Sequence, residues 1–431
     1  MAERIYRTVV ATDQSARPSS KTDDAQRRAE PRNFFLFVGS HFLTKLGDAL
    51  SNPKTTLTWL AGTLGVPGWM TALLVPLRES GSMLLQIGLA GSVQRFAHRK
   101  WAWSLGSLLQ AASMFGMALC ALFLRGRTAG LVLLGLLALF ALSRSLSSVA
   151  SKDVLGRTLP KQRRGRATGW AASAAGVATL GIGAGAMLLG PDTLNATGYA
   201  ALLTGAGVLW LLAALLFTAV REPRAKSDGE DSQTRLRMLF RDAQLRHFVI
   251  ARALLMCTSL SAPYYVMLAQ HHLGHSPRLL AAFIVAEGLA SMLGGPVWGR
   301  LADRSSRQVM VIGGLGGAGL GATLAAASLW WNGLLALAWV MPLMFFALSL
   351  AHQAVRTGRK TYVVDMAEGD QRTNYVAVSN SAIGVLLLTV GGAMAALSAW
   401  SLAAVLAALA LMGLCGAVLS LRLPEVETED T

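Results

Sequence analysis

The segment Gly299-Arg-Leu-Ala-Asp-Arg-Ser-Ser-Arg307 is a short charged stretch between two long apolar runs, residues 277–299 and 309–329. A helix needs about 20 mostly apolar residues to cross the hydrocarbon core of a bilayer. Each run is long enough for one crossing, and the segment between them is only long enough for a tight connection. This local pattern predicts two membrane helices joined by a basic loop.

Composition extends the same interpretation to the whole chain. The 431 residues are 53% hydrophobic and only 14% charged, whereas soluble globular proteins carry about 25% charged residues. The low charge therefore argues against a soluble domain, and the apolar content excludes disorder outside the chain ends. The three cysteines lie within apolar runs and show no metal-ligand spacing, so neither a zinc site nor a disulfide framework is indicated.

Twelve apolar runs of spanning length follow one another in two sets of six. They lie near 34–59, 68–93, 101–124, 129–150, 167–190, 196–220, 247–270, 277–299, 309–329, 332–355, 375–397 and 400–421. We therefore expect an all-α polytopic membrane protein, with one six-helix bundle at 34–220 and a second at 247–421. The polar segments 1–33, 221–246 and 422–431 are expected to be a disordered N-terminal tail, a central loop and a C-terminal tail.

The distribution of basic residues gives the expected orientation. With the N-terminus inside, the segments assigned to the cytoplasm hold 31 of the 39 Lys and Arg, and the outside loops hold 3. Cytoplasmic loops of membrane proteins carry this excess. Both termini are thus expected in the cytoplasm, and the net charge of +16 reflects topology rather than nucleic-acid binding. Residues 1–33 lack the apolar core of a signal peptide. We expect a monomer in a bacterial cytoplasmic (inner) membrane, in contact with membrane lipids.

The two halves also match each other at a constant offset of 208 residues. Glu79 then matches Glu287, Arg99 matches Arg307, and Lys152 matches Lys360. Chance apolar similarity does not explain matched charges at one offset. A duplicated six-span unit is typical of transporters built from internal repeats.

With its twelve predicted spans, basic loops and internal repeat, the chain from about 34 to 421 resembles the major facilitator superfamily. The segment Gly299–Arg307, with Asp303 and Arg304, is similar to the G-x-x-x-D-R-x-x-R loop of that family. Its counterpart after the second span keeps Gly91 and Arg99, but Arg95 replaces the family's Asp. The resemblance implies two pseudo-symmetric six-helix bundles that work by alternating access, with these six family positions (Gly91, Arg99, Gly299, Asp303, Arg304 and Arg307) in gating loops.

The resemblance reaches two further features. Arg144 in the fourth span resembles the arginine of a family motif, although the glycine expected after it is absent. The glycines of the fifth span, including Gly176 and Gly183, are similar to the family's antiporter motif without its Gly-Pro pair. Close helix packing explains such glycines equally well.

The first span carries a polar stripe. His41, Lys45, Asp48 and Asn52 follow one another at i, i+4, i+7 and i+11, which places them on one narrow helix face. Ionisable groups within a membrane face the protein interior or water. We therefore expect a helix that lines a cavity, kinked at Pro53, with Asp48 and Lys45 either as a paired functional site or as a structural ion pair.

Two acids and one base add to this candidate site. Glu79 and Glu287 are related by the repeat and lie mid-span, where an acid that loads and releases a proton would couple transport to the proton gradient. Each acid could instead be held by a neighbouring base. Arg78 is then expected either to bind substrate or to pair between helices. Lys54 and Arg252, closer to span ends, are expected to extend toward the interface. The five span bases exceed the three acids, which favours an anionic solute.

The sequence thus predicts a secondary transporter for a small organic solute, driven by protons, with no cofactor. Alternatives are a multidrug efflux exporter and a transporter-like receptor or assembly factor without flux. A minor alternative is a copper or other transition-metal transporter, suggested by His271, His272, His275 and 16 methionines. An enzyme is not expected, because no nucleophile–base constellation is present. The GxGxxG match at Gly314–Gly319 has no preceding strand and is interpreted as a small-residue helix face.

Overall fold

A computed structural model describes residues 24–84, 97–188, 195–223, 242–366 and 371–426. Within this part of the chain every regular element is helical. The N-terminal half contains α2 (Asp24–Leu50), α3 (Thr56–Thr63), α4 (Gly68–Ala72), α5 (Leu74–Leu84), α7 (Arg99–Phe123), α8 (Gly126–Thr158), α9 (Lys161–Leu188) and α10 (Ala196–Thr218). The C-terminal half contains α12 (Ala243–Leu255), α13 (Cys257–Leu260), α14 (Ala262–Leu273), α15 (Pro277–Ala302), α16 (Ser306–Trp330), α17 (Asn332–Leu335), α18 (Val340–Asp365), α19 (Gln371–Ser398) and α20 (Leu402–Leu421).

Each of the twelve predicted spans corresponds to one helix or to a run of consecutive helices. Eight described segments are long and apolar enough to cross a membrane: α7, α8, α10, the run α12–α14, α15, α16, residues 378–398 of α19, and α20. The other four spans are α2–α3, α4–α5, α9 and α18. Spans 1, 2 and 10 carry polar or charged residues toward the protein interior, which lowers their mean hydropathy. The predicted all-helical membrane fold is confirmed.

Two spans are broken at equivalent places in the repeat. The first ends as α2 at Leu50 and resumes as α3 at Thr56, so the chain departs from the helix at Asn52-Pro53, as expected from Pro53. At the offset of 208, the seventh span breaks into α12, α13 and α14 around Met256 and Ser261. Breaks in membrane helices are tolerated where they are buried in protein or line a cavity.

The halves pack against each other through two helix pairs, α5 with α19 and α9 with α15. Glycines allow the close approach. A Cβ at Gly391 would lie 2.2 Å from the Pro76 side chain, and one at Gly384 would lie 2.9 Å from the Leu84 backbone. In the fifth span, a Cβ at Gly183 would meet Val285 at 3.0 Å, so this glycine serves packing.

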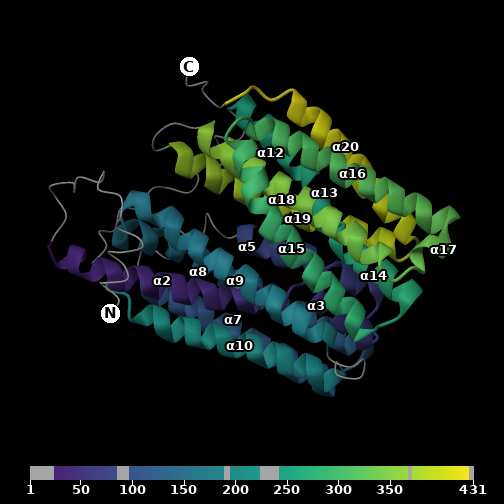
Figure 1. Ribbon diagram of the computed structural model, residues 1–431, viewed down its shortest axis with the longest axis horizontal. Coiled ribbons are helices and arrows are strands. Elements are labelled where there is room, and N and C mark those ends of the chain that lie inside the picture. The colour runs from purple at the N-terminus through teal and green to yellow at the C-terminus, as the bar shows by residue number, and fades with distance from the viewer. Residues whose placement is uncertain (1–23, 85–96, 189–194, 224–241, 367–370, 427–431) are drawn as a thin grey trace.

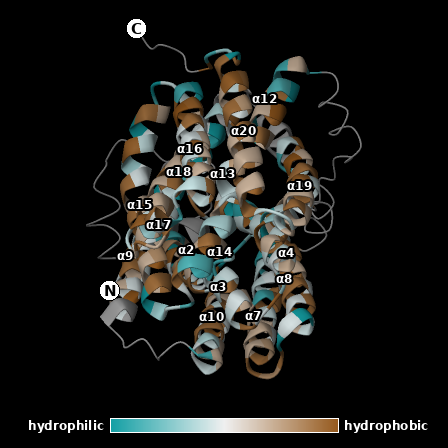
Figure 2. Cartoon of the chain, turned by 90° about the vertical axis from the view of Figure 1, so that its right-hand side faces the viewer, coloured by the Kyte–Doolittle hydropathy of each residue, from teal (hydrophilic) through white to brown (hydrophobic). Residues whose placement is uncertain are grey.

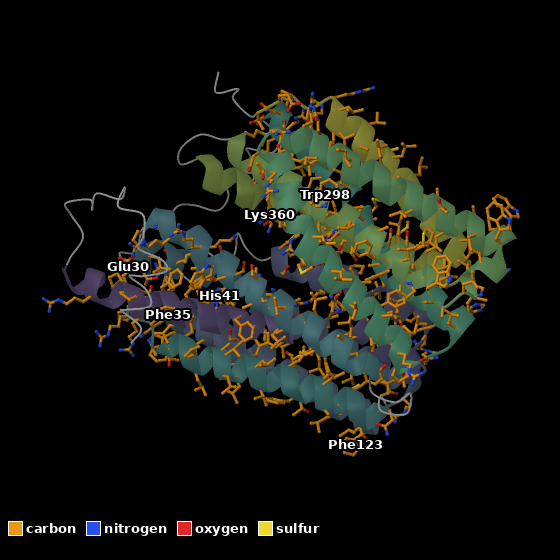
Figure 3. The ribbon with its side chains drawn as sticks, viewed as in Figure 1. Glu30, Phe35, His41, Phe123, Trp298 and Lys360 are labelled. Carbon is orange, nitrogen blue, oxygen red and sulfur yellow. The ribbon has the colours of Figure 1, made fainter. Side chains whose placement is uncertain are left out.

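The outer faces of the bundles are apolar. Hydrophobic colour dominates α15, α19 and α20 (Figure 2). Phe123 is 75% exposed and points away from the bundle (Figure 3), and Trp400 is 87% exposed. Large exposed apolar surfaces are unusual in soluble monomers and suit contact with lipid.

The helices of the two halves diverge toward the side on which α2 begins and α20 ends (Figure 1). We call this side the terminal face and the other side the opposite face. At the terminal face, Asn33 of α2 exchanges two hydrogen bonds of 2.9 Å with the backbone of Arg221, just after α10. The start of the first helix is thereby fixed to the end of the sixth.

Candidate functional site

Asp48 of α2 lies at the centre of an ion-pair cluster in the N-terminal half. Its Oδ1 accepts from Arg144 of α8 at 2.8 Å, its Oδ2 lies 2.6 Å from the second Arg144 nitrogen, and Arg78 of α5 also donates to Oδ1. The Arg78 guanidinium lies over the Phe140 ring, 4.1 Å from its centroid. Two arginines thus share one carboxylate, and the cluster keeps one net positive charge.

The polar stripe of the first span serves several different contacts. Asp48 forms its ion pairs with Arg78 and Arg144 rather than with Lys45, whose side chain has no hydrogen bond within the described residues. Lys45 nevertheless interacts electrostatically with Asp48 and with Arg356 of α18. His41 stacks on Phe37 at 3.8 Å, and its Nε2 lies 2.8 Å from the Ser151 hydroxyl of α8.

Asn52 connects the two halves at the break in the first span. Its amide nitrogen donates to Glu287 Oε2 of α15 at 2.6 Å, and its Oδ1 accepts from the Lys54 backbone at 2.9 Å. The Lys54 side chain interacts electrostatically with both Glu79 and Glu287, the two repeat-related acids. Lys54 is therefore directed into the protein and not toward a membrane interface. One base from the N-terminal half faces one acid from each half.

Arg252 of α12 is buried, with 5% of its surface exposed, and not directed to the interface as the sequence suggested. It donates to the Ser379 hydroxyl at 2.6 Å and to Asn380 Oδ1 at 2.8 Å, both on α19. Arg359 of α18 is 6% exposed and lies 2.6 Å from the Met256 sulfur. Within the described residues, neither arginine forms an ion pair with an acid.

Arg359 and its neighbour Arg356 are site residues that the sequence interpretation placed in a loop. The helix α18 continues to Asp365, so both side chains lie on it. Arg359 interacts electrostatically with Glu79 across the boundary between the halves. A signal was available: His352, Arg356 and Arg359 follow at i, i+4 and i+7, the same spacing as His41, Lys45 and Asp48.

A cavity of about 230 Å³ lies between α2, α7, α8 and α10, beside Arg144. Its polar lining includes His41, Gln110 and Lys152, and two tryptophans, Trp103 and Trp210, line it as well. It is a polar recess within the N-terminal half that reaches the Asp48 partner Arg144.

The predicted gating residues at the terminal face form two similar latches. Arg99, at the start of α7, donates through Nε to Asp153 of α8 at 2.8 Å, and its backbone nitrogen donates to Glu222 at 3.0 Å. Arg307, its repeat partner, lies 2.7 Å from Glu425. Glu222 and Glu425 each follow the last helix of their half by four residues.

The other predicted gating residues lack such contacts or lie outside the described residues. Asp303 and Arg304 are exposed at the end of α15, and the described part of the chain contains no ion pair for either side chain. A Cβ at Gly299 would meet nothing within 4 Å. Gly91 lies outside the described residues.

At the opposite face, α3 and α14 hold the halves together. Trp59 donates through Nε1 to the His275 carbonyl at 3.4 Å, and Gln270 donates to the Trp59 carbonyl at 3.4 Å. Gly62 lies so close that a Cβ there would be 2.8 Å from both Gln270 and His275. Partial burial lowers the pKa of His275. His271 and His272 lie at the end of α14, and His275 follows it. Among the described residues, no group of three His, Cys, Asp or Glu side chains could hold a metal ion.

A family model described as Major Facilitator Superfamily matches residues 37–338 and 253–431, which together include both halves. The chain belongs to the major facilitator superfamily. It is therefore a transporter of the membrane. No curated protein matches the sequence.

Solved superfamily transporters share this fold at low sequence identity. The inward-open conformation of the xylose transporter XylE from E. coli matches with a TM-score of 0.67 at 13% identity, over 92% of this chain and 97% of that chain. A POT family transporter in complex with 5-aminolevulinic acid gives 0.71 at 10% identity, over 91% and 96%. The nucleoside transporter NupG gives 0.65 at 12% identity, over 90% and 98%.

Proposed function

We propose that the protein is a proton-coupled secondary transporter that moves a small organic anion by alternating access. The observation that carries this proposal is the charge between the two halves. Among the described residues, three acids, Asp48, Glu79 and Glu287, lie among a larger number of bases, which include Lys45, Lys54, Arg78, Arg144, Arg252, Arg356 and Arg359. Burying uncompensated positive charge is costly unless an anion compensates it. A site with this excess attracts anionic solutes and repels cationic ones.

Alternating access is supported by where the halves touch. The contacts of Trp59, Gln270 and His275 join them at the opposite face. At the terminal face, Lys45 and Lys152 of one half act electrostatically on Lys360 of the other, and Figure 3 places Lys360 and His41 on the two diverging halves. Like charges oppose closure of that side. An anion bound between the halves reduces this repulsion and so favours the closed state.

Proton coupling is assigned to Glu79 and Glu287. Glu287 receives the Asn52 hydrogen bond that crosses between the halves, and Lys54 faces both acids. A carboxylate attracts Lys54, whereas a protonated carboxyl does not. Proton loading therefore weakens one inter-half connection, which is the change that a rocking transporter requires.

We further propose that the terminal face lies in the cytoplasm of a bacterial inner membrane, with both chain tails there. The positive-inside distribution of the basic loops supports this orientation. The bundles are then 34–220 and 247–421, joined by the cytoplasmic loop 221–246, and the monomer is the working unit because each chain contains both bundles.

Reconstituted liposomes test this proposal. Liposomes that contain the protein are loaded with unlabelled succinate or glycerol 3-phosphate. Counterflow of the labelled compound is then measured with and without an inward proton gradient. Anion counterflow that a proton gradient accelerates supports the proposal. Flux confined to lipophilic cations would favour multidrug export, and binding without flux would favour a receptor.

A further inference from the structure

Two buried guanidinium groups of the C-terminal half form no ion pair with a carboxylate among the described residues. Arg252 and Arg359 are 5% and 6% exposed, and each repels the other's charge. The Nε atoms of both are buried without a hydrogen-bond partner. A buried charge is normally paired, and a buried donor is normally satisfied. Here both conditions are unmet at neighbouring residues.

The side chains that these arginines contact directly are neutral. Arg252 donates to a hydroxyl and to an amide oxygen, and Arg359 contacts a thioether, which is a weak acceptor. These contacts orient the guanidinium planes without neutralising them. Pre-oriented guanidinium forks match the geometry of carboxylate and phosphate oxygens.

The repeat shows which group is missing. At the offset of 208, Asp48, which forms ion pairs with two arginines in the N-terminal half, corresponds to Met256, the residue that contacts Arg359. The C-terminal half therefore has its arginine against an apolar side chain at the position where the other half has a carboxylate.

We propose that Arg252 and Arg359, supported by Ser379 and Asn380, form a binding site for an oxyanion group of the transported solute, either a carboxylate or a phosphate. The site rests on the proposed anion transport and specifies where the charged end of the solute binds. Both arginines belong to the C-terminal half, so the remainder of the solute extends toward the N-terminal half.

Glu79 is the counter-charge of this site when no solute is bound. Its carboxylate on α5 interacts electrostatically with Arg359, and also with Lys54, Arg78 and Arg356. A solute oxyanion and the Glu79 carboxylate thus compete for Arg359. Protonation of Glu79 removes this competition, so anion binding and proton binding favour each other, which is the linkage that symport requires.

Thermal stabilisation of the purified full-length protein in detergent tests the site, because a ligand that binds the folded state raises the melting temperature. The probes are inorganic phosphate, succinate and glycerol 3-phosphate, with succinamide and glycerol as neutral counterparts. The variants are Arg252→Gln, Arg252→Lys and Arg359→Gln. Arg278→Gln is the matched control, because Arg278 is exposed at the start of α15.

We expect at least one anion, and neither neutral compound, to stabilise the wild-type protein. Arg252→Gln and Arg359→Gln should weaken its apparent affinity about 30-fold, since each removes charge-assisted hydrogen bonds. Arg252→Lys should retain part of the affinity and Arg278→Gln all of it. Glu79→Gln retains both arginines and should bind the anion about tenfold more tightly.

Different results would overturn the proposed binding site and the proposed anion transport. If the wild-type protein transports an anion but its affinity is unchanged in both arginine-to-glutamine variants, the site is overturned and the transport proposal stands. If no anion stabilises the wild-type protein and none is transported, both are overturned. Affinity unchanged in Glu79→Gln would overturn the competition between Glu79 and the solute.

Discussion

The two halves share a fold but neutralise their buried arginines differently. In the N-terminal half, Asp48 forms ion pairs with Arg78 and Arg144, although one buried nitrogen of Arg78 has no hydrogen-bond partner among the described residues. In the C-terminal half, Met256 stands at the corresponding position, and Arg252 and Arg359 have no ion-pair partner among the described residues. The repeated backbone therefore sets where charged side chains gather, and a single side chain decides whether their charge is compensated by the protein or is available to a solute.

Asp48→Asn makes the N-terminal half resemble the C-terminal half and should have the largest effect. Breaking a buried ion pair costs about 3–5 kcal/mol. Because Arg144 is partly exposed, we expect a loss of stability of about 3 kcal/mol. Transport should be abolished while the protein still folds. Liposome flux and thermal unfolding measure both, with Asp48→Glu as the charge-conserving control. Normal flux in Asp48→Asn would remove Asp48 from the mechanism.

Met256→Asp makes the opposite change, because it gives Arg359 a carboxylate where the N-terminal half has one. The new carboxylate should compete with the solute and weaken binding of succinate or glycerol 3-phosphate about tenfold. Met256→Asn, of similar size but uncharged, is the matched control for the loss of the thioether. Equal binding in the two variants would show that charge at this position does not matter.

Glu79→Gln and Glu287→Gln compare the two repeat-related acids. Glu79 faces Arg359, whereas Glu287 accepts a hydrogen bond from Asn52. We therefore expect Glu79→Gln to flatten the pH dependence of anion binding, and Glu287→Gln to change the pH dependence of flux with little effect on affinity. Measuring both quantities from acidic to alkaline pH separates the roles. Unchanged pH profiles in both variants would exclude these acids from proton coupling.

Most of the fold could be predicted from the sequence, because hydrophobic runs, basic loops and a constant repeat offset are local or periodic signals. The polar stripe His41–Lys45–Asp48–Asn52 was also readable, since helical spacing fixes one face. The ion-pair partners of Asp48 could not be predicted. They are Arg78 and Arg144 from other helices, and nothing in the stripe favours them over Lys45. Arg252 resembles an interfacial residue in the sequence because it lies close to the predicted end of its span.

Arg359 was missed for a related reason. Charge density beyond residue 355 suggested a loop, whereas α18 continues as a helix and buries Arg359. Its i, i+4, i+7 relation to His352 and Arg356 was present in the sequence and indicates one face. Burial of such a charge depends on the opposing half, with Glu79 on α5, and that packing has no local sequence signature.

The terminal-face latches are the most symmetric feature of the two halves, and their burial distinguishes them. Arg99 is 2% exposed and Arg307 26% exposed, although each contacts an acid that follows the last helix of its half. Arg99→Gln should therefore cost about 2 kcal/mol of stability through the buried donors that it removes, and Arg307→Gln less than about 1 kcal/mol, as for a surface ion pair. Thermal unfolding of the two variants makes the comparison, and equal losses would contradict it.

Asp303→Ala should have the smallest effect on stability, because Asp303 is exposed and forms no ion pair in the described part of the chain. Its similarity to the family's gating aspartate nevertheless predicts slower cycling between states. Turnover should fall several-fold while the apparent affinity for the anion stays constant, since Asp303 is exposed whereas Arg252 and Arg359 are buried. Initial rates of counterflow over a range of anion concentrations separate turnover from affinity. An unaltered maximal rate would show that the C-terminal loop does not need its acid, in line with the sequence of the N-terminal loop, which has Arg95 at the matching position.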